Sequence, residues 1–238
     1  MNSPEDLREL LKKLLALELT DKELEDHWQH LEKNKLTPSS RHGGNNIGFS
    51  PRFIMGLISQ ASKRSGLDIT HSRFKKIREE IYPAIFFALL LKKLGYAEFI
   101  LVPSDVPDIV FVDYKSVLEQ KKRYRVRATP LECMFLSKEV FEATQVLPTT
   151  EHIAKIIIEK KFAKAYRKET ILLVTVAPED TTFELNKLSV LLQGPTNPFH
   201  QIWILIGQGT EGCILARLTP EFEMHNLNIP KDLLPHLY

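Results

Sequence analysis

This 238-residue chain has few cysteines, the residues that stabilise disulfide-rich domains and many structural metal sites. Its two cysteines, Cys133 and Cys213, lie in apolar, strand-like runs and lack the paired spacing of a zinc site. This scarcity argues against a disulfide framework and against a structural metal. It predicts two buried, reduced thiols in a protein that works in a reducing compartment.

Long hydrophobic runs and an excess of one charge are also missing. The longest unbroken apolar run, 84–91, is far shorter than the roughly 20 residues that a membrane span needs. The first residues are acidic, and no basic segment precedes an apolar core as it would in a secretory signal. Because 32 basic residues nearly balance 30 acidic ones, a site for a polyanion would have to be a local patch. We therefore expect a soluble, cytoplasmic protein with no membrane partner.

The N-terminal part of the chain is rich in helix signals. A serine-proline step at 3–4 begins one leucine-striped helix, and a capping box at 20–23 begins a second. Residues 37–50 are dense in glycine, serine and asparagine, which is typical of a linker. We therefore predict a helical region over 1–69 and an α/β domain over 70–238.

From residue 70 onward, helical and strand patterns alternate. A helical stretch over 71–94 is interrupted by Pro83 and stops at Gly95. Further helices are expected over 138–145, over 150–167 and before the strand at 202. Strands are expected over 96–102, 108–112, 124–136, 171–176 and 202–206, and after 212. This order predicts an α/β fold with a mixed sheet that is covered on both faces.

Two carboxylates on successive expected strands form the main candidate site. Pro107-Asp108 opens the second of these strands, and Glu132 lies on the third. If the two strands are neighbours, both carboxylates converge on one point. Mg²⁺ takes oxygen ligands of this kind and can then activate water against a phosphodiester.

In motif and element order, residues 70–178 resemble the PD-(D/E)xK restriction-endonuclease-like superfamily. The resemblance implies a restriction-endonuclease-like core in which Asp108 and Glu132 bind Mg²⁺ or Mn²⁺. It also implies a lysine that orients or activates the attacking water, two residues after the glutamate. That position is Met134, which carries no charge and donates no strong hydrogen bond.

Because Met134 occupies the expected lysine position, a lysine from another part of the chain could take over that role. Some members of the superfamily supply it from the helix after the third strand, and here Lys138 and Lys160 are the candidates. Lys160 shares a helical face with an apolar stripe formed by Ile153, Ile156 and Ile157. A shifted strand register or an inactivated site explains Met134 as simply, so these alternatives stay open.

The resemblance also implies an acidic residue on the first helix that assists the site. At about 100° per residue, and with Ile77 at the centre of the buried stripe, Glu80 lies about 60° off that stripe. Glu79 points roughly in the opposite direction. We therefore take Glu80 as the assisting acid and Glu79 as a solvated residue.

Two groups of basic residues adjoin the proposed site, one at 63–78 on its helical side and one at 121–127 between its two strands. Local basic stripes give sequence-independent contacts with nucleic-acid phosphates. The predicted DNA contacts are Arg73, Lys75, Lys76, Arg125 and Arg127.

Other motifs carry less weight. The glycine pattern at 207–212 is followed by another strand, so it predicts a hairpin turn and not a dinucleotide site. Phe199 and Trp203 lie in or beside the most apolar late strand, which favours core packing over base stacking.

Three functional hypotheses result. The first is a restriction-enzyme-like, metal-dependent DNA endonuclease that hydrolyses phosphodiester bonds, working as a homodimer because cutting both strands needs two active sites. The second is a catalytically inactive protein of the same fold that binds nucleic acid or a partner protein. The third is an α/β interaction module unrelated to nucleases.

Overall fold

The computed structural model describes residues 51, 55, 77–96, 99–103, 109–113, 128–136, 149–176, 184–208 and 212–228. They divide between two compact units. The first contains the described residues up to Asp113 together with Ala128, and the second contains those from Thr129 to Asn228. The helices and the linker expected within 1–50, and the boundary at 69, lie outside the described residues.

In the first unit, a π-helical turn, η2 (Ile77–Ile81), leads into α4 (Tyr82–Lys93). Pro83 is the second residue of α4, so its missing N–H lies where the π-turn ends and the α-helix begins. The interruption predicted at Pro83 is therefore confirmed, as a change from a π-turn to an α-helix.

The C-terminus of α4 is closed by Gly95, as predicted. Gly95 has a φ of 84°, a left-handed conformation that glycine adopts without steric cost. Its N–H donates to the carbonyl of Lys92 (3.1 Å), and the N–H of Tyr96 donates to the carbonyl of Leu91 (3.0 Å). These two bonds form a Schellman motif, which satisfies carbonyls that the helix end would leave without partners.

An antiparallel hairpin accompanies α4 in the first unit. It pairs β1 (Phe99–Pro103) with β2 (Ile109–Asp113). The rings of Phe87 in α4 and Phe111 in β2 stack with their centroids 5.9 Å apart, and both side chains are buried. Because almost every residue of α4 is buried, the expectation of an apolar helix inside a domain is confirmed.

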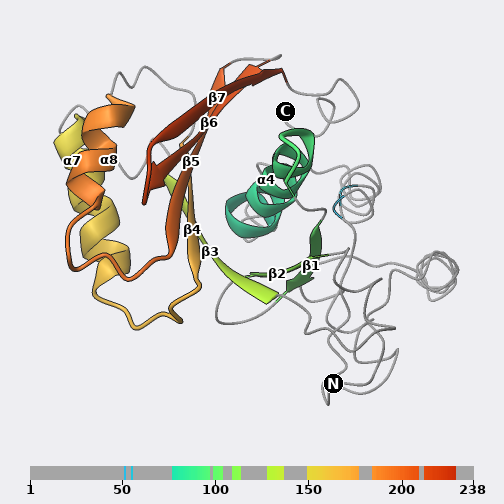
Figure 1. Ribbon diagram of the computed structural model, residues 1–238, viewed down its shortest axis with the longest axis horizontal. Coiled ribbons are helices and arrows are strands. Elements are labelled where there is room, and N and C mark those ends of the chain that lie inside the picture. The colour runs from blue at the N-terminus through green and yellow to red at the C-terminus, as the bar shows by residue number, and fades with distance from the viewer. Residues whose placement is uncertain are drawn as a thin grey trace, which may run out of the picture. The chain divides into compact units, whose positions relative to one another are not determined.

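The described elements of the second unit alternate in the order predicted for them (Figure 1), and the helix expected over 138–145 lies outside the described residues. Its elements are β3 (Ala128–Leu136), α7 (Thr150–Ile157), the π-turn η4 (Ile158–Phe162), β4 (Ile171–Val176), α8 (Leu185–Leu192), β5 (Gln201–Gln208), β6 (Gly212–Thr219) and β7 (Glu223–Asn228).

The strands β3 to β7 lie side by side in chain order and form a mixed sheet. The ladders from β3 to β4 and from β4 to β5 are parallel, and those from β5 to β6 and from β6 to β7 are antiparallel. β3 passes through Pro130 without interruption, because its ladder with β4 begins one residue later, at Leu131. The predicted α/β class with a mixed sheet is confirmed.

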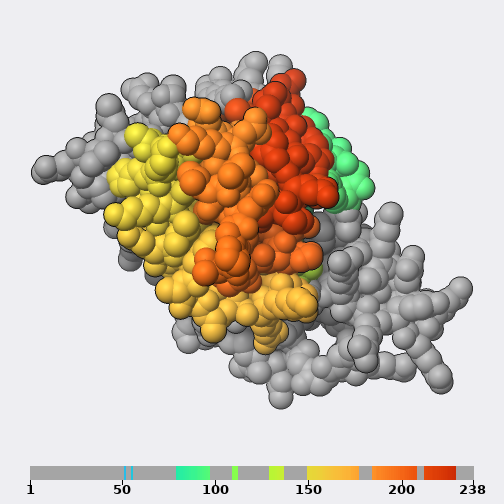
Figure 2. Space-filling model, turned by 60° about the vertical axis from the view of Figure 1, so that its left-hand side comes forward, coloured from blue at the N-terminus to red at the C-terminus, as the bar shows by residue number. Residues whose placement is uncertain are grey.

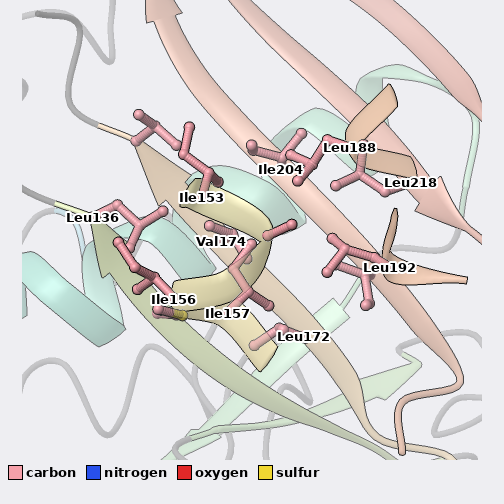
Figure 3. Packing of buried hydrophobic residues seen from close by; sticks show 14 of the residues in the cluster. Leu136, Ile153, Ile156, Ile157, Leu172, Val174, Leu188, Leu192, Ile204 and Leu218 are labelled. Carbon is pink, nitrogen blue, oxygen red and sulfur yellow. The ribbon is translucent and has the colours of Figure 1, made fainter. Parts of the chain in front are cut away.

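The helices α7 and α8 pack against one face of this sheet (Figure 3). Alternate strand residues point into that layer, as the two-residue period of a strand requires. The labelled members of the cluster are Leu136, Ile153, Ile156, Ile157, Leu172, Val174, Leu188, Leu192, Ile204 and Leu218. Each fully buried side chain of this size contributes about 1.5–3 kcal/mol of hydrophobic stabilisation, so this layer is the main core of the unit.

The opposite face of the sheet is buried as well. Leu173, Trp203 and Leu215 are at most 1% exposed, and the thiols Cys133 and Cys213 are buried. Both faces are thus buried over β3 to β6, whereas alternate residues of β7 are exposed. The expectations of buried thiols and of a core position for Trp203 are confirmed.

The glycine pattern at 207–212 spans the connection between β5 and β6. Gly207 pairs with Cys213 and Gln208 with Gly212, which confirms the predicted hairpin. Within the described part of the chain, no helix has the length and apolar character needed to cross a membrane.

Candidate functional site

Glu132 is a buried carboxylate at the centre of β3. It lies on the face that α7 and α8 cover, together with Met134 and Leu136. Glu132 and Met134 share one strand face as predicted, and Met134 packs in the apolar cluster. A carboxylate in such a position costs several kcal/mol unless hydrogen bonds and an opposite charge compensate it.

Lys161 and Tyr166 supply this compensation. Lys161 Nζ donates to Glu132 Oε1 at 2.6 Å and also to the carbonyl oxygen of Cys133 at 2.8 Å. The Tyr166 hydroxyl donates to the same Oε1 at 3.2 Å. The side chains of Lys161 and Glu132 are 13% and 9% exposed, so water screens their attraction weakly.

Three aromatic rings pack beside this ion pair. The ring centroids of Tyr166 and Phe199 are 4.5 Å apart, and those of Phe162 and Phe199 are 6.0 Å apart. Phe162 and Tyr166 also pack against the core cluster. The rings therefore fix the Tyr166 hydroxyl in place and keep the surroundings of the pair apolar.

The π-turn η4 decides which lysine reaches Glu132. The α-helical period predicts Lys160, yet Lys160 is exposed and its neighbour Lys161 makes the contact. A π-turn holds one more residue than an α-turn, so every later side chain is delayed by one position. The helix expected over 150–167 also ends earlier, with η4 at Phe162, which leaves Tyr166 in the connection to β4.

Sequence reasoning missed both partners of Glu132. Nothing in a run of charged residues such as Glu159, Lys160 and Lys161 signals a π-turn, so the neighbouring lysines cannot be told apart from the sequence. Tyr166 falls within the helix expected over 150–167, and the sequence predicts no role for it at the site.

The remaining predicted residues fall into two groups. Glu80 and Glu79 lie in η2 of the first unit and are both half-buried, so Glu79 is not the solvated residue expected. The angular count assumed an α-helix, and the π-turn changes the angle between successive residues. Outside the described residues lie Asp108, Lys138, Arg73, Lys75, Lys76, Arg125 and Arg127.

A metal at this site would use Glu132 as one of its ligands. Among the described residues, no group of three or more His, Cys, Asp or Glu side chains could hold a metal ion. A carboxylate has about four acceptor positions, and the two donors to Glu132 both bind Oε1. The carboxylate thus has the capacity, and as a hard oxygen donor the chemistry, for one bond to Mg²⁺.

Comparisons of the chain with protein-family models, with curated proteins and with solved structures found no match. The chemistry of Glu132 and its partners is therefore the basis for any functional argument. A buried lysine held against a carboxylate can give a hydrogen bond to a water molecule or to a phosphate oxygen that approaches the pair.

Proposed function

We propose that this chain is a metal-dependent endonuclease with a restriction-endonuclease-like core that hydrolyses phosphodiester bonds in DNA. The observation that carries the proposal is the 2.6 Å contact between Lys161 Nζ and Glu132 Oε1. It joins a glutamate on the third strand to a lysine from the segment after it, which is where some members of the superfamily carry their lysine. Lys161 would thus supply the ammonium group that is missing at position 134.

The order of elements supports the same proposal. A helix, three strands, a helix and a further strand follow one another, and β4 is parallel to β3. The α7–η4 crossover between these parallel strands runs along the face on which Glu132 lies. A lysine near its end can therefore reach the middle of β3.

Each proposed residue has a distinct role. Asp108 and Glu132 hold Mg²⁺ or Mn²⁺, and Glu80 assists. Lys161 orients the attacking water, a role that the sequence alone assigns to Lys138 or Lys160. The bound metal would supply an activated water and stabilise the charge that develops on the phosphate. The residues proposed to contact the DNA backbone are Arg73, Lys75, Lys76, Arg125 and Arg127. Two buried thiols suit work in the reducing cytoplasm.

A second candidate function is supported by the same contact. Lys161 pairs with Glu132, and Tyr166 donates to the same oxygen, so the buried carboxylate has partners that do not include a cation from solution. A protein of this fold that binds nucleic acid or a partner protein without cleaving anything would keep such a pair for its structural effect alone.

Cleavage assays separate the two candidates. The full chain is incubated with Mg²⁺ or Mn²⁺ and with plasmid, linear duplex, single-stranded DNA and RNA. Asp108→Ala should abolish cleavage, and Lys161→Met should lower it by at least about 100-fold, since a positioned acid or base contributes about 10²–10⁴. Lys160→Met is the matched control and should retain full activity, because its side chain is exposed.

The cleavage assay can be interpreted only if each variant is folded. Circular dichroism and thermal melting of each variant show whether lost activity reflects lost structure. Absence of cleavage on every substrate, or cleavage that survives Asp108→Ala, would refute the nuclease proposal. Binding of the same substrates without cleavage would favour the inactive candidate.

A further inference from the structure

Exposed apolar side chains gather on the outer surface of the helical layer. Figure 2 shows α7 with η4 (yellow) beside α8 (orange) on the face turned to the viewer. Ile158 in η4 and Leu191 in α8 are 37% and 38% exposed, and Val190 in α8 is 71% exposed. Single exposed apolar residues are ordinary, but Ile158 and Leu191 line the same depression and Val190 adjoins Leu191 in α8. We call these three residues and the charges around them the α7–α8 face.

The α7–α8 face contains a shallow depression. Its volume is about 330 Å³, and it is lined by Glu151, Ala154, Lys155, Ile158, Glu159 and Leu191. An ion pair between Glu151 and Lys187 links α7 to α8 at its edge. Residues of both helices line the depression, and another apolar surface can pack there.

The charges of this face are balanced. Glu151 and Glu159 are offset by Lys155 and Lys187, so the face offers no net attraction for a nucleic-acid backbone. Lys155 and Glu159 are four residues apart and lie 3.8 Å from each other, and both are largely exposed. Such an exposed pair is weak and can exchange partners at little cost.

We propose that the α7–α8 face pairs with the same face of a second copy of this chain around a twofold axis. In a twofold interface the two patches meet in opposite directions. With the axis passing near Ile158, each Lys155 meets Glu159 of the second copy, and the three apolar residues cover one another. The pattern of charges is thus complementary to itself, which selects a second copy over a differently charged partner.

This inference does not depend on the nuclease proposal, because it uses other residues and a different measurement. Sedimentation of the full chain over a concentration series should show a monomer–dimer equilibrium with a dissociation constant in the micromolar range, as expected for a small interface. Val190→Asp should weaken the dimer by at least about tenfold, since it places two charges in an apolar contact.

Two further variants make the test specific. Lys155→Glu should also weaken the dimer about tenfold, because it sets like charges opposite each other, and the double variant Lys155→Glu with Glu159→Lys should restore it. Met224→Asp, at a 48% exposed apolar residue on β7, is the control and should leave the dimer unchanged. A chain that stays monomeric, a dimer insensitive to Val190→Asp, or equal weakening by Met224→Asp would overturn the proposal.

Discussion

The ammonium group of Lys161 lies 2.6 Å from Oε1 of Glu132, with both side chains largely withdrawn from water. Removing either partner would leave the other charge buried and uncompensated, which costs more than the pair contributes when intact. The contact joins the π-turn after α7 to the middle of β3. It therefore has a measurable structural effect whether or not the chain cleaves DNA.

The first prediction concerns the loss of this pair. Lys161→Met should lower the free energy of unfolding by about 3 kcal/mol, because the Glu132 carboxylate then stays buried without its counter-charge. Lys160→Met, at the exposed neighbouring position, should change it by less than about 0.5 kcal/mol. Chemical denaturation of both variants measures the difference.

Adding Glu132→Gln tests the cause of that loss. In the double variant with Lys161→Met no charge is buried, so part of the lost stability should return, and the two single effects should not add. Additive effects would show that the two side chains do not interact in solution.

The second prediction concerns the Tyr166 hydroxyl. Tyr166→Phe removes the 3.2 Å hydrogen bond to Glu132 but keeps the ring against Phe199, so it should cost about 1 kcal/mol. Tyr166→Ala also removes the ring contact and should cost at least about 1 kcal/mol more. Equal losses in the two variants would mean that the ring makes no contribution.

The third prediction compares two positions of α8. Leu188 is fully buried in the core cluster and Val190 is 71% exposed. Leu188→Ala should therefore cost about 3 kcal/mol through the cavity that it leaves, whereas Val190→Ala should stay within about 0.5 kcal/mol of the wild type. Thermal and chemical unfolding both report this contrast, and similar losses at the two positions would contradict the orientation of α8.

The fourth prediction concerns pH. The hydrogen bond from Lys187 is the main cause that lowers the pKa of Glu151, and the same bond raises the pKa of Lys187. The Glu151 contribution to stability is thus present above the ordinary pKa of 4.5 and is lost as the pH falls through the lowered pKa. The Lys187 contribution is present below the ordinary pKa of 10.5 and is lost as the pH rises through the raised pKa.

Melting curves across this range check the sign. The pair is exposed, so Glu151→Gln should lower the melting temperature only slightly at neutral pH. The difference from the wild type should disappear in acid, once the native carboxylate is protonated. A difference that grows as the pH falls would contradict the assignment.

Much of the fold followed from periodicity and from helix stop signals. The strand over 171–176 agrees with β4 at both ends, and Gly95 ends α4 as predicted. These features depend on local chemistry, which is an unbroken run of apolar residues in one case and a left-handed glycine in the other. The order of the helices and strands was therefore easier to predict than the contacts between residues of different elements.

The candidate site was predictable only in part. The shared strand face of Glu132 and Met134 follows from the two-residue period of a strand and is confirmed. The difference between Lys160 and Lys161 depends on the π-turn η4, which the charged residues at 159–161 do not signal. The half-burial of Glu79 differs from expectation for the same reason, because η2 is also a π-turn.

The π-turn η4 also affects how relatives of this chain should be sought. A single inserted residue is the simplest origin of such a turn, so a relative without it would be one residue shorter between the third strand and its lysine. That lysine would then align with Lys160, although its side chain would do what Lys161 does here, 29 positions after Glu132. Search patterns for this site should therefore allow a gap of variable length after α7.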